Sequence, residues 1–216
     1  MTGREELLAR LRRNGIRDES VLAAIGRVPR ERFVPEHLRR LAYDDGALPL
    51  GHGATVSQPT MVARMCEELA LSGSERVLDV GTGSGYAAAV LAELADEVVG
   101  IELVPELAEG ARDALDAAGY DVRVLVGDGS LGVPELAPFD AISVAAAAPA
   151  PPPALVAQLA PGGRLVVPVG RRRQRLTLVV NGEDGPVVTR SVACRFVPLV
   201  GGQGFDAPPE GEDPDA

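Results

Sequence analysis

Apolar residues recur at helical spacing at the start of this chain. Leucines line one face of residues 4–13, which predicts an amphipathic helix. Asp18 is a good N-cap for a second helix, and residues 37–41, which follow Pro35, predict a third. We therefore expect a small helical annex before the rest of the fold.

A second pattern, in which short apolar runs alternate with helical ones, begins near residue 60. The expected helices cover 60–70, the stretch ending at 94, 105–118 and about 154–159, and the expected strands cover 76–80, 98–103, 122–126, 139–145 and 164–169. Two further strands, 176–180 and 187–194, predict a hairpin around Asn181-Gly182. This alternation predicts an α/β fold with a doubly wound, mostly parallel, Rossmann-like sheet and an antiparallel C-terminal edge.

Three regions follow from these patterns. Residues 1–59 hold the helical annex and a turn-rich loop, and residues 60–205 hold the sheet domain. Residues 206–216, DAPPEGEDPDA, are acidic and rich in proline, and such a composition predicts a disordered tail.

Composition narrows the possible functions. The net charge is -10 and lysine is absent, so lysine chemistry is excluded and nucleic acid is not an expected partner. The basic run Arg171–Arg173 is expected to be a solvated turn. Cys66 and Cys194 are expected to be buried free thiols in a reducing cytoplasm. Residues 141–160 are uncharged, but their prolines exclude a membrane span, so no membrane partner is expected. The protein is expected to be a monomer.

The stretch VLDVGTGSGY, residues 77–86, predicts a strand that runs into glycines and then a helix, a turn that lets a ligand touch the backbone. Glu102 is expected at the end of the next strand, where a carboxylate accepts from both ribose hydroxyls. Tyr86 replaces the third glycine of the dinucleotide fingerprint. Asp79 would repel a pyrophosphate and attract the cationic groups of S-adenosylmethionine. With Asp128 positioned to accept from the adenine amine, the sequence favours S-adenosylmethionine over NAD.

The segment from 43 to 59, YDDGALPLGHGATVSQP, is full of turn formers and is expected to be an ordered loop. It has neither a G-x-S-x-G nucleophile elbow nor any metal-ligand spacing, so no metal site is expected. His52, between two glycines, can shape the loop or touch a substrate. Ser57 can cap the helix over 60–70 or face a ligand.

Seven segments resemble the protein-L-isoaspartate O-methyltransferase family. They are RVPRERFVP (27–35), ALPLGHGATVSQPTMVARM (47–65), VLDVGTGSGYAAAVLAEL (77–94), GDG (127–129), APFDAISVAAAAP (137–149), GGRLVVPVG (162–170) and RFVPLVGG (195–202). The Ser-Gln-Pro loop and RFVPLVGG are more specific than the glycine turn, which many methyltransferases share. The resemblance implies a methyltransferase sheet and protein repair, in which a methyl group passes from S-adenosylmethionine to L-isoaspartyl residues of damaged proteins or peptides.

The resemblance also implies site residues. Ser57 matches the family's active-site serine. The expected cofactor-binding residues are Asp79, Gly81, Thr82, Gly83, Ser84, Gly85, Glu102, Leu103, Gly127, Asp128 and Gly129. The expected substrate-binding residues are His52, Thr55, Val56, Ser57, Gln58, Pro59, Ala145, Ala146, Val167 and Pro168.

The expected chemistry needs no general base. A carboxylate, with an ordinary pKa of about 4, is ionised at neutral pH. The enzyme must align the acceptor oxygen and exclude water, so Ser57 is expected to orient the carboxylate rather than act as a nucleophile. Two other functions stay open on the sequence: a carboxyl methyltransferase of the same fold that acts on a natural-product peptide or small acid, and a non-catalytic cofactor-binding module.

Overall fold

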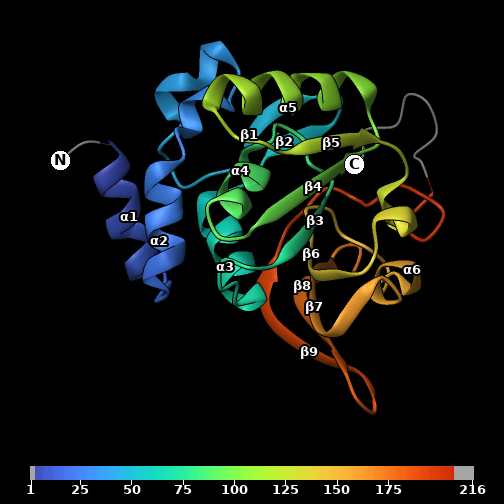
Figure 1. Cartoon of the computed structure of the whole chain (residues 1–216). Helices are drawn as coiled ribbons and strands as arrows, with labels where there is room; N and C mark the ends of the chain where they lie inside the picture. Colours follow the sequence, from blue (N-terminus) through green and yellow to red (C-terminus); the bar gives the residue numbers. More distant parts are fainter. Residues whose placement is uncertain (1–2, 207–216) are drawn as a thin grey trace.

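The computed structural model describes residues 3–206 and is built around a seven-stranded sheet (Figure 1). The order across the sheet is β5-β4-β3-β6-β7-β8-β9. The strands are β3 (Arg76–Val80), β4 (Glu97–Glu102), β5 (Arg123–Val126), β6 (Phe139–Val144), β7 (Leu159–Val169), β8 (Gln174–Gly182) and β9 (Gly185–Cys194). The first five strands in this order, from β5 through β4, β3 and β6 to β7, pair in parallel. Strand β8 pairs antiparallel with β7, and β9 pairs antiparallel with β8. The predicted fold class is therefore confirmed.

The strand order reverses between β3 and β6. From β3 the chain builds outward through β4 and β5 in one direction, and later through β6 and β7 in the other. The last residues of the two central strands, Val80 and Val144, are paired, so these strands end side by side. Ligands of open parallel sheets bind at the carboxyl edge beside such a reversal.

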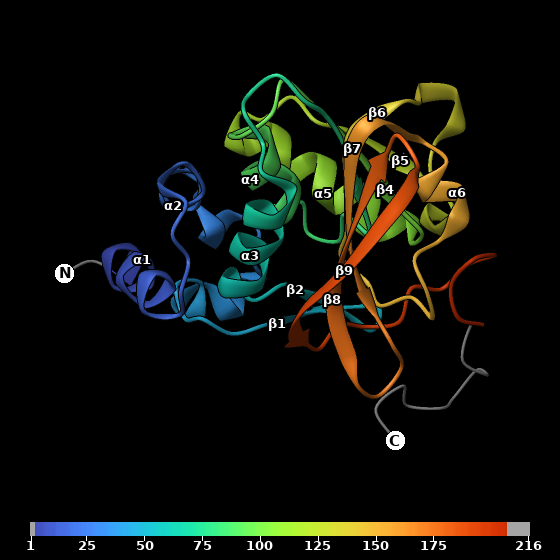
Figure 2. The ribbon, with the colours of Figure 1, turned by 90° about the horizontal axis from the view of Figure 1, so that it is seen from below.

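Helices cover both faces of the sheet (Figure 2). On one face lie α3 (Pro59–Leu69), α4 (Tyr86–Ala92) and α5 (Pro105–Ala118), and on the other lies the short α6 (Pro153–Val156), with the 3-10 turns η3 (Gly129–Leu131) and η4 (Pro134–Leu136) nearby. Successive residues of β3 alternate between the two cores: Val77 packs into the first cluster and Leu78 into the second. A buried polar residue on β3 therefore belongs to one face only.

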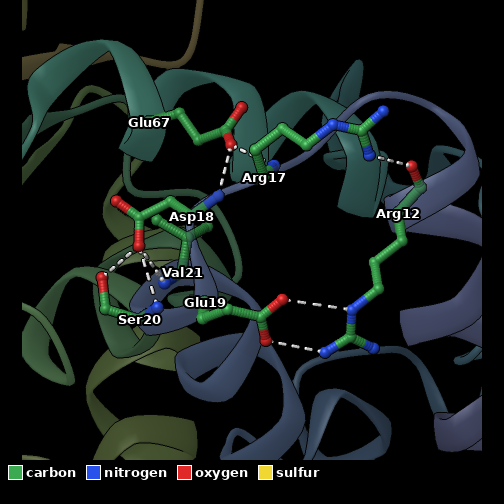
Figure 3. A network of polar contacts seen from close by, with 7 residues as sticks. All are labelled: Arg12, Arg17, Asp18, Glu19, Ser20, Val21 and Glu67. Atoms are coloured by element: carbon green, nitrogen blue, oxygen red, sulfur yellow. Dashed lines mark hydrogen bonds and ion pairs between the residues drawn. The ribbon is translucent and has the colours of Figure 1, made fainter.

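The N-terminal annex consists of α1 (Gly3–Arg13), α2 (Glu19–Arg27) and the 3-10 helices η1 (Arg30–Arg32) and η2 (Glu36–Leu41). Asp18 caps α2 as predicted, accepting from the amides of Ser20 and Val21. Figure 3 shows how the annex meets α3: Glu67 accepts from the amides of Arg17 (2.6 Å) and Asp18 (2.8 Å). Annex leucines share one core cluster with α3 and α4, so the annex is packed onto the sheet domain.

The segment expected to be a loop contains a two-stranded hairpin, β1 (Leu48–Gly51) and β2 (Ala54–Val56). The turn between them is His52-Gly53, with φ of 52° and 72°. Two central residues with positive φ match the type I′ turn that joins short hairpins. The expectation of a loop was wrong because Pro49 and three glycines mask a strand pattern only three or four residues long.

Three other elements differ from the sequence predictions, and one predicted region is not tested. Residues 36–41 form a 3-10 helix, not an α-helix. Strand β7 begins at Leu159, which was expected to end a helix, because Leu159 pairs with Phe139. The C-terminal hairpin reverses at Glu183-Asp184 rather than at Asn181-Gly182, since Gly182 pairs with Gly185. The proposed tail, 206–216, lies outside the described residues except for Asp206.

Several simpler predictions are confirmed. Arg171–Arg173 is an exposed turn between β7 and β8, and both cysteines are free. Cys66 is buried as expected, but Cys194 is only half-buried because it lies at the end of the edge strand β9. Within residues 3–206, no helix is both long and apolar enough to cross a membrane.

Candidate active site at the carboxyl edge of the sheet

The glycine turn leaves β3 and enters α4 as an open bend of backbone. Gly81, Gly83 and Gly85 all have positive φ, at 78°, 55° and 85°. Gly85 is also crowded, because a Cβ atom there would lie 3.1 Å from the Leu115 side chain of α5. Side chains are thus kept away from the turn, and its backbone is accessible to a ligand.

Polar side chains within the turn hold its shape. The Thr82 hydroxyl donates to the backbone carbonyl of Asp79 at 3.2 Å, and Ser84 Oγ accepts from the amide of Tyr86 at 3.3 Å. Thr82 is 4% exposed. These two residues therefore stabilise the turn, and only the half-buried Ser84 has surface to offer a ligand.

Glu102 lies at the end of β4, as predicted, and its carboxylate is tied to the glycine turn. One oxygen accepts from the amide of Gly83 at 2.9 Å and the other from the amide of Val104 at 3.0 Å. A carboxylate oxygen has two acceptor sites, so each oxygen retains one for a ligand hydroxyl. Leu103, the next residue, is 43% exposed and offers an apolar surface at the same edge.

Asp79 is completely buried near the end of β3, on the face covered by α3 and α4. Neither carboxylate oxygen has a hydrogen-bond partner within residues 3–206. Burial, with a smaller contribution from the neighbouring Glu102 charge, raises the pKa of Asp79 to about 7. An unpartnered buried carboxylate is costly. A cationic ligand would relieve that cost, so this position fits a ligand that carries positive charge.

Asp128 follows β5 and is already engaged within the chain. One oxygen accepts from the amide and hydroxyl of Ser130 (2.9 and 2.6 Å), and the other from the amide of Gly202 (2.7 Å). Although burial opposes it, these hydrogen bonds hold the pKa of Asp128 below its ordinary value. A Cβ at Gly201 would lie 2.0 Å from Asp128, so glycine is needed there. The expected adenine acceptor therefore also fixes the C-terminal loop, with acceptor capacity remaining on the oxygen that faces Gly202.

The two glycines that flank Asp128 adjoin the other strand ends. Gly127 donates its amide to the carbonyl of Glu102 at 2.9 Å. Gly129 is buried against Val80, where an added Cβ would lie 2.6 Å from the valine side chain. The ends of β3, β4 and β5, with their three acidic residues, thus lie next to one another, as the sequence predicted.

Ser57 lines a small cavity on the same face of the sheet as Asp79. The cavity measures about 10 Å³ and is also lined by Ser143, Ala145 and apolar side chains of α3 and α4. That volume holds about one water molecule. Ser143 is paired with Asp79 across β3 and β6, so the cavity lies between the Ser57 segment and the centre of the sheet. Within residues 3–206 the Ser57 hydroxyl makes no hydrogen bond.

Ser57 does not cap α3. The N-cap position is Gln58, whose side chain instead donates to the carbonyl of Asp45 at 3.2 Å. Asp45 does the capping, because it accepts from the amide of Thr60 at 2.9 Å and from the Thr60 hydroxyl at 2.7 Å. The Ser57 hydroxyl is therefore available to a ligand, and Asp45 is a site-supporting residue that sequence reasoning missed.

The remaining expected substrate residues divide into accessible and buried groups. Thr55 and His52 are exposed, whereas Val56 and Pro59 are buried. Near the ends of β6 and β7, the side chains of Ala146, Val167 and Pro168 are buried, and Val167 packs into the core on the α6 face. Of the four residues expected to wall a peptide slot, only Ala145 reaches the Ser57 cavity.

Two more residues of the site could not be assigned to it from the sequence. Ser143 is a buried polar residue inside an apolar strand, and that contrast was visible in the sequence. Arg30 is fully buried and contacts the Ser57 backbone, but it stands in an annex with many surface arginines that gave no sign of its burial. Among residues 3–206 no group of histidine, cysteine, aspartate and glutamate could hold a metal ion.

Known proteins with similar sequences share one description. The family profile described as "Protein-L-isoaspartate(D-aspartate) O-methyltransferase (PCMT)" matches residues 2–204. Protein-L-isoaspartate O-methyltransferase 2 of Marinobacter nauticus is 57% identical over 195 residues, which cover 88% of this chain and 89% of that protein. Protein-L-isoaspartate O-methyltransferase 1 of an Anaeromyxobacter species is also 57% identical over 195 residues, covering 88% of this chain and 92% of its own.

Solved structures agree with this description. One protein-L-isoaspartate O-methyltransferase superposes with a TM-score of 0.82 at 31% identity and covers 93% of this chain and 66% of its own. A Plasmodium falciparum structure, described as a beta-aspartate methyltransferase in complex with S-adenosyl-L-homocysteine, superposes with a TM-score of 0.80 at 28% identity, covering 90% and 97% of the two chains.

Proposed function

This chain belongs to the protein-L-isoaspartate(D-aspartate) O-methyltransferase family. We propose that Ser57 aligns the acceptor carboxylate of the substrate, and that Asp79, the glycine turn, Glu102 and Asp128 hold the cofactor beside it. The enzyme methylates L-isoaspartyl residues in protein repair, with S-adenosylmethionine as the cofactor. The observation that carries the site assignment is the unpartnered, buried carboxylate of Asp79 on the face where Ser57 lines a cavity.

The residues present fit this cofactor. The Asp79 carboxylate can pair with the cationic groups of S-adenosylmethionine. Glu102 keeps two acceptor sites for ribose hydroxyls, and Asp128 keeps one for the adenine amine. S-adenosylmethionine supplies an electrophilic methyl group on a sulfonium. Ser57 donates to one oxygen of the acceptor carboxylate, and apolar side chains of α3 and α4 exclude water from the cavity. No base is required, since the acceptor is ionised at neutral pH.

A paired-peptide assay tests the activity. An isoaspartyl peptide and the matching aspartyl peptide are offered with labelled S-adenosylmethionine. Methylation of the isoaspartyl peptide alone is the expected result. Equal transfer to both peptides would favour a broader carboxyl methyltransferase, and tight cofactor binding without transfer would favour a non-catalytic module.

We further propose that the enzyme acts as a monomer in a reducing cytoplasm on proteins and peptides, not on nucleic acid or membranes. The free thiols of Cys66 and Cys194 support the compartment, and the charge of -10 disfavours nucleic acid and other anionic surfaces. Sedimentation of the purified enzyme at assay concentration tests the monomer.

Cofactor binding is expected to strengthen as the pH rises towards 7. Without a cofactor, Asp79 has a pKa of about 7 and is largely protonated at pH 6. A cationic ligand favours the ionised carboxylate, so binding releases a proton and affinity rises by up to about tenfold per pH unit below 7. The nearby Cys66 thiol stays neutral in this range, because burial raises its pKa to about 12.

Calorimetry between pH 5.5 and 7, in buffers that differ in ionisation enthalpy, measures this proton release directly. The Asp79→Asn variant is the control and should bind more weakly with no pH dependence. Wild-type binding without proton release would show that Asp79 does not meet the cationic part of the cofactor.

Replacing His52 with asparagine is expected to leave kcat and its pH dependence unchanged. His52 is exposed and occupies a left-handed turn position, which asparagine tolerates well. Stability should change by no more than about 0.5 kcal/mol, as for other exposed sites. The measurement is kcat from pH 6 to 9 with both substrates saturating. A histidine base would give a pH inflection in kcat that disappears in the variant, and such a result would contradict alignment-only catalysis.

A further inference from the structure

Arg30 is a fully buried arginine that reaches across the base of the β1–β2 hairpin. Its Nη1 donates to the carbonyl of Ala42 at 2.6 Å, with Asp44 at 3.5 Å, and its Nη2 donates to the carbonyls of Gly46 at 3.1 Å and Ser57 at 3.0 Å. The first three acceptors precede β1 and the last follows β2. One guanidinium therefore holds together the two ends of the segment that carries Ser57.

The same guanidinium contacts the cofactor side of the site. Its Cζ lies 5.2 Å from the ring centroid of Tyr86, the residue that follows Gly85 at the start of α4. Phe33 also packs against Tyr86, with its ring centroid 6.1 Å from that of Tyr86. Arg30 thus touches both the helix that extends from the glycine turn and the backbone of the proposed acceptor-aligning serine.

Only neutral groups accept from this buried charge, and they accept from its two terminal nitrogens, while Nε is buried without a hydrogen-bond partner among residues 3–206. Its four oxygen acceptors are backbone carbonyls, and no carboxylate within residues 3–206 forms an ion pair with it. The fork of an arginine can bond several carbonyls in one plane while its face lies on an aromatic ring, which a lysine ammonium cannot do. A buried charge usually stabilises a fold less than apolar packing of similar volume does. The contacts of Arg30 instead suit a side chain that fixes the position of the backbone on both sides of the hairpin.

We propose that Arg30 is a positioning residue for the methyl transfer, which sets the place of Ser57 relative to the glycine turn by holding the Ser57 carbonyl. The inference rests on the proposed role of Ser57. In a site where acceleration comes from alignment, a shift of about 1 Å in a positioned group costs about 10²-fold in rate. Arg30 touches neither substrate nor cofactor in this scheme and acts only through the segment that it holds.

The test is a double-mutant cycle of Arg30→Lys and Ser57→Ala. Arg30→Lys is expected to lower kcat by about 10²-fold, with little change in the Kd of S-adenosylmethionine. In the Ser57→Ala background the same exchange should change kcat by no more than about twofold, because no aligned hydroxyl remains to be displaced. Hydrogen exchange of amides 48–57 should also be faster in Arg30→Lys, with strand β3 unaffected.

Arg32→Lys is the matched control, since Arg32 lies in the same 3-10 helix and donates to a carbonyl, that of Ala117 at 2.6 Å, on the surface. It should leave all these quantities unchanged. An undiminished fall in kcat in the Ser57→Ala background, or a lower melting temperature with unchanged kcat, would overturn the proposal. A neutral Ser57→Ala single variant would instead overturn the role of Ser57 itself.

Should Arg30→Lys fail to fold, Tyr86→Leu takes its place in the cycle. That exchange removes the aromatic face beneath the guanidinium but keeps every carbonyl acceptor. It should again lower kcat, and again lose its effect when Ser57 is alanine. Additive effects in this second cycle would overturn the proposal equally.

Discussion

Replacing Ser57 with alanine is expected to lower kcat by about 10²–10³-fold, the usual cost of removing one positioned donor from a closed site. Residual transfer should remain, because the acceptor is already ionised and no covalent intermediate is lost. The Kd of S-adenosylmethionine should barely change, since Ser57 lines a cavity with Ala145 and Ser143, and Glu102 is not among the residues that line it. Steady-state kinetics with an isoaspartyl peptide, together with calorimetry for the cofactor, give both quantities.

Two further variants sharpen that test. Ser57→Thr keeps the hydroxyl but adds a methyl group, and a cavity of about 10 Å³ has little room for it, so its kcat should fall well below wild type. Ser74→Ala, in the exposed loop beyond the far end of α3, is the serine control and should be neutral. Complete loss of transfer in Ser57→Ala would point to a nucleophilic serine, and an unchanged kcat would remove Ser57 from the reaction.

The fold was predictable where one signal dominated. Strand Arg76–Val80 and helix Pro105–Ala118 match their predicted bounds, because an apolar run and a proline at the first helical position leave no alternative. The β1–β2 hairpin was not predictable: its pairing depends on His52 accepting a left-handed backbone, which residue preferences disfavour. The position of Leu159 in β7, where a helix end was predicted, likewise depends on its pairing with Phe139 of β6.

The site shows the same division. Acidic residues at the ends of parallel strands must converge on one edge, so Asp79, Glu102 and Asp128 could be grouped without coordinates. Their hydrogen-bond partners could not be predicted from the sequence. Asp128 accepts a hydrogen bond from Gly202, 74 residues away, while the Asp79 carboxylate has no partner within residues 3–206. Burial of Arg30 was equally hidden, because it depends on four carbonyls brought together only by the folded hairpin.

Replacing Glu102 with alanine is expected to weaken the binding of S-adenosylmethionine by about 1.5–3 kcal/mol, the usual worth of hydrogen bonds to a charged group. That corresponds to roughly a 10- to 150-fold rise in Kd. The structure gives two reasons for the loss. The variant lacks acceptors for ribose hydroxyls, and it frees the amides of Gly83 and Val104, which Glu102 now fixes at 2.9 and 3.0 Å. With saturating cofactor, kcat and the peptide KM should stay close to wild type.

Glu102→Gln separates those two reasons. One acceptor oxygen remains, so affinity should fall less than in Glu102→Ala, but the new amide group must face either Gly83 or Val104 with a donor against a donor. Glu97→Ala is the matched control at the other end of β4, where the carboxylate forms an exposed ion pair with Arg76 at 2.8 Å, and its Kd should match wild type. Calorimetry that finds the same Kd for wild type and Glu102→Ala would exclude Glu102 from the cofactor site. A change confined to the peptide KM would assign the Glu102 carboxylate to the binding site of the acceptor peptide instead of the cofactor site.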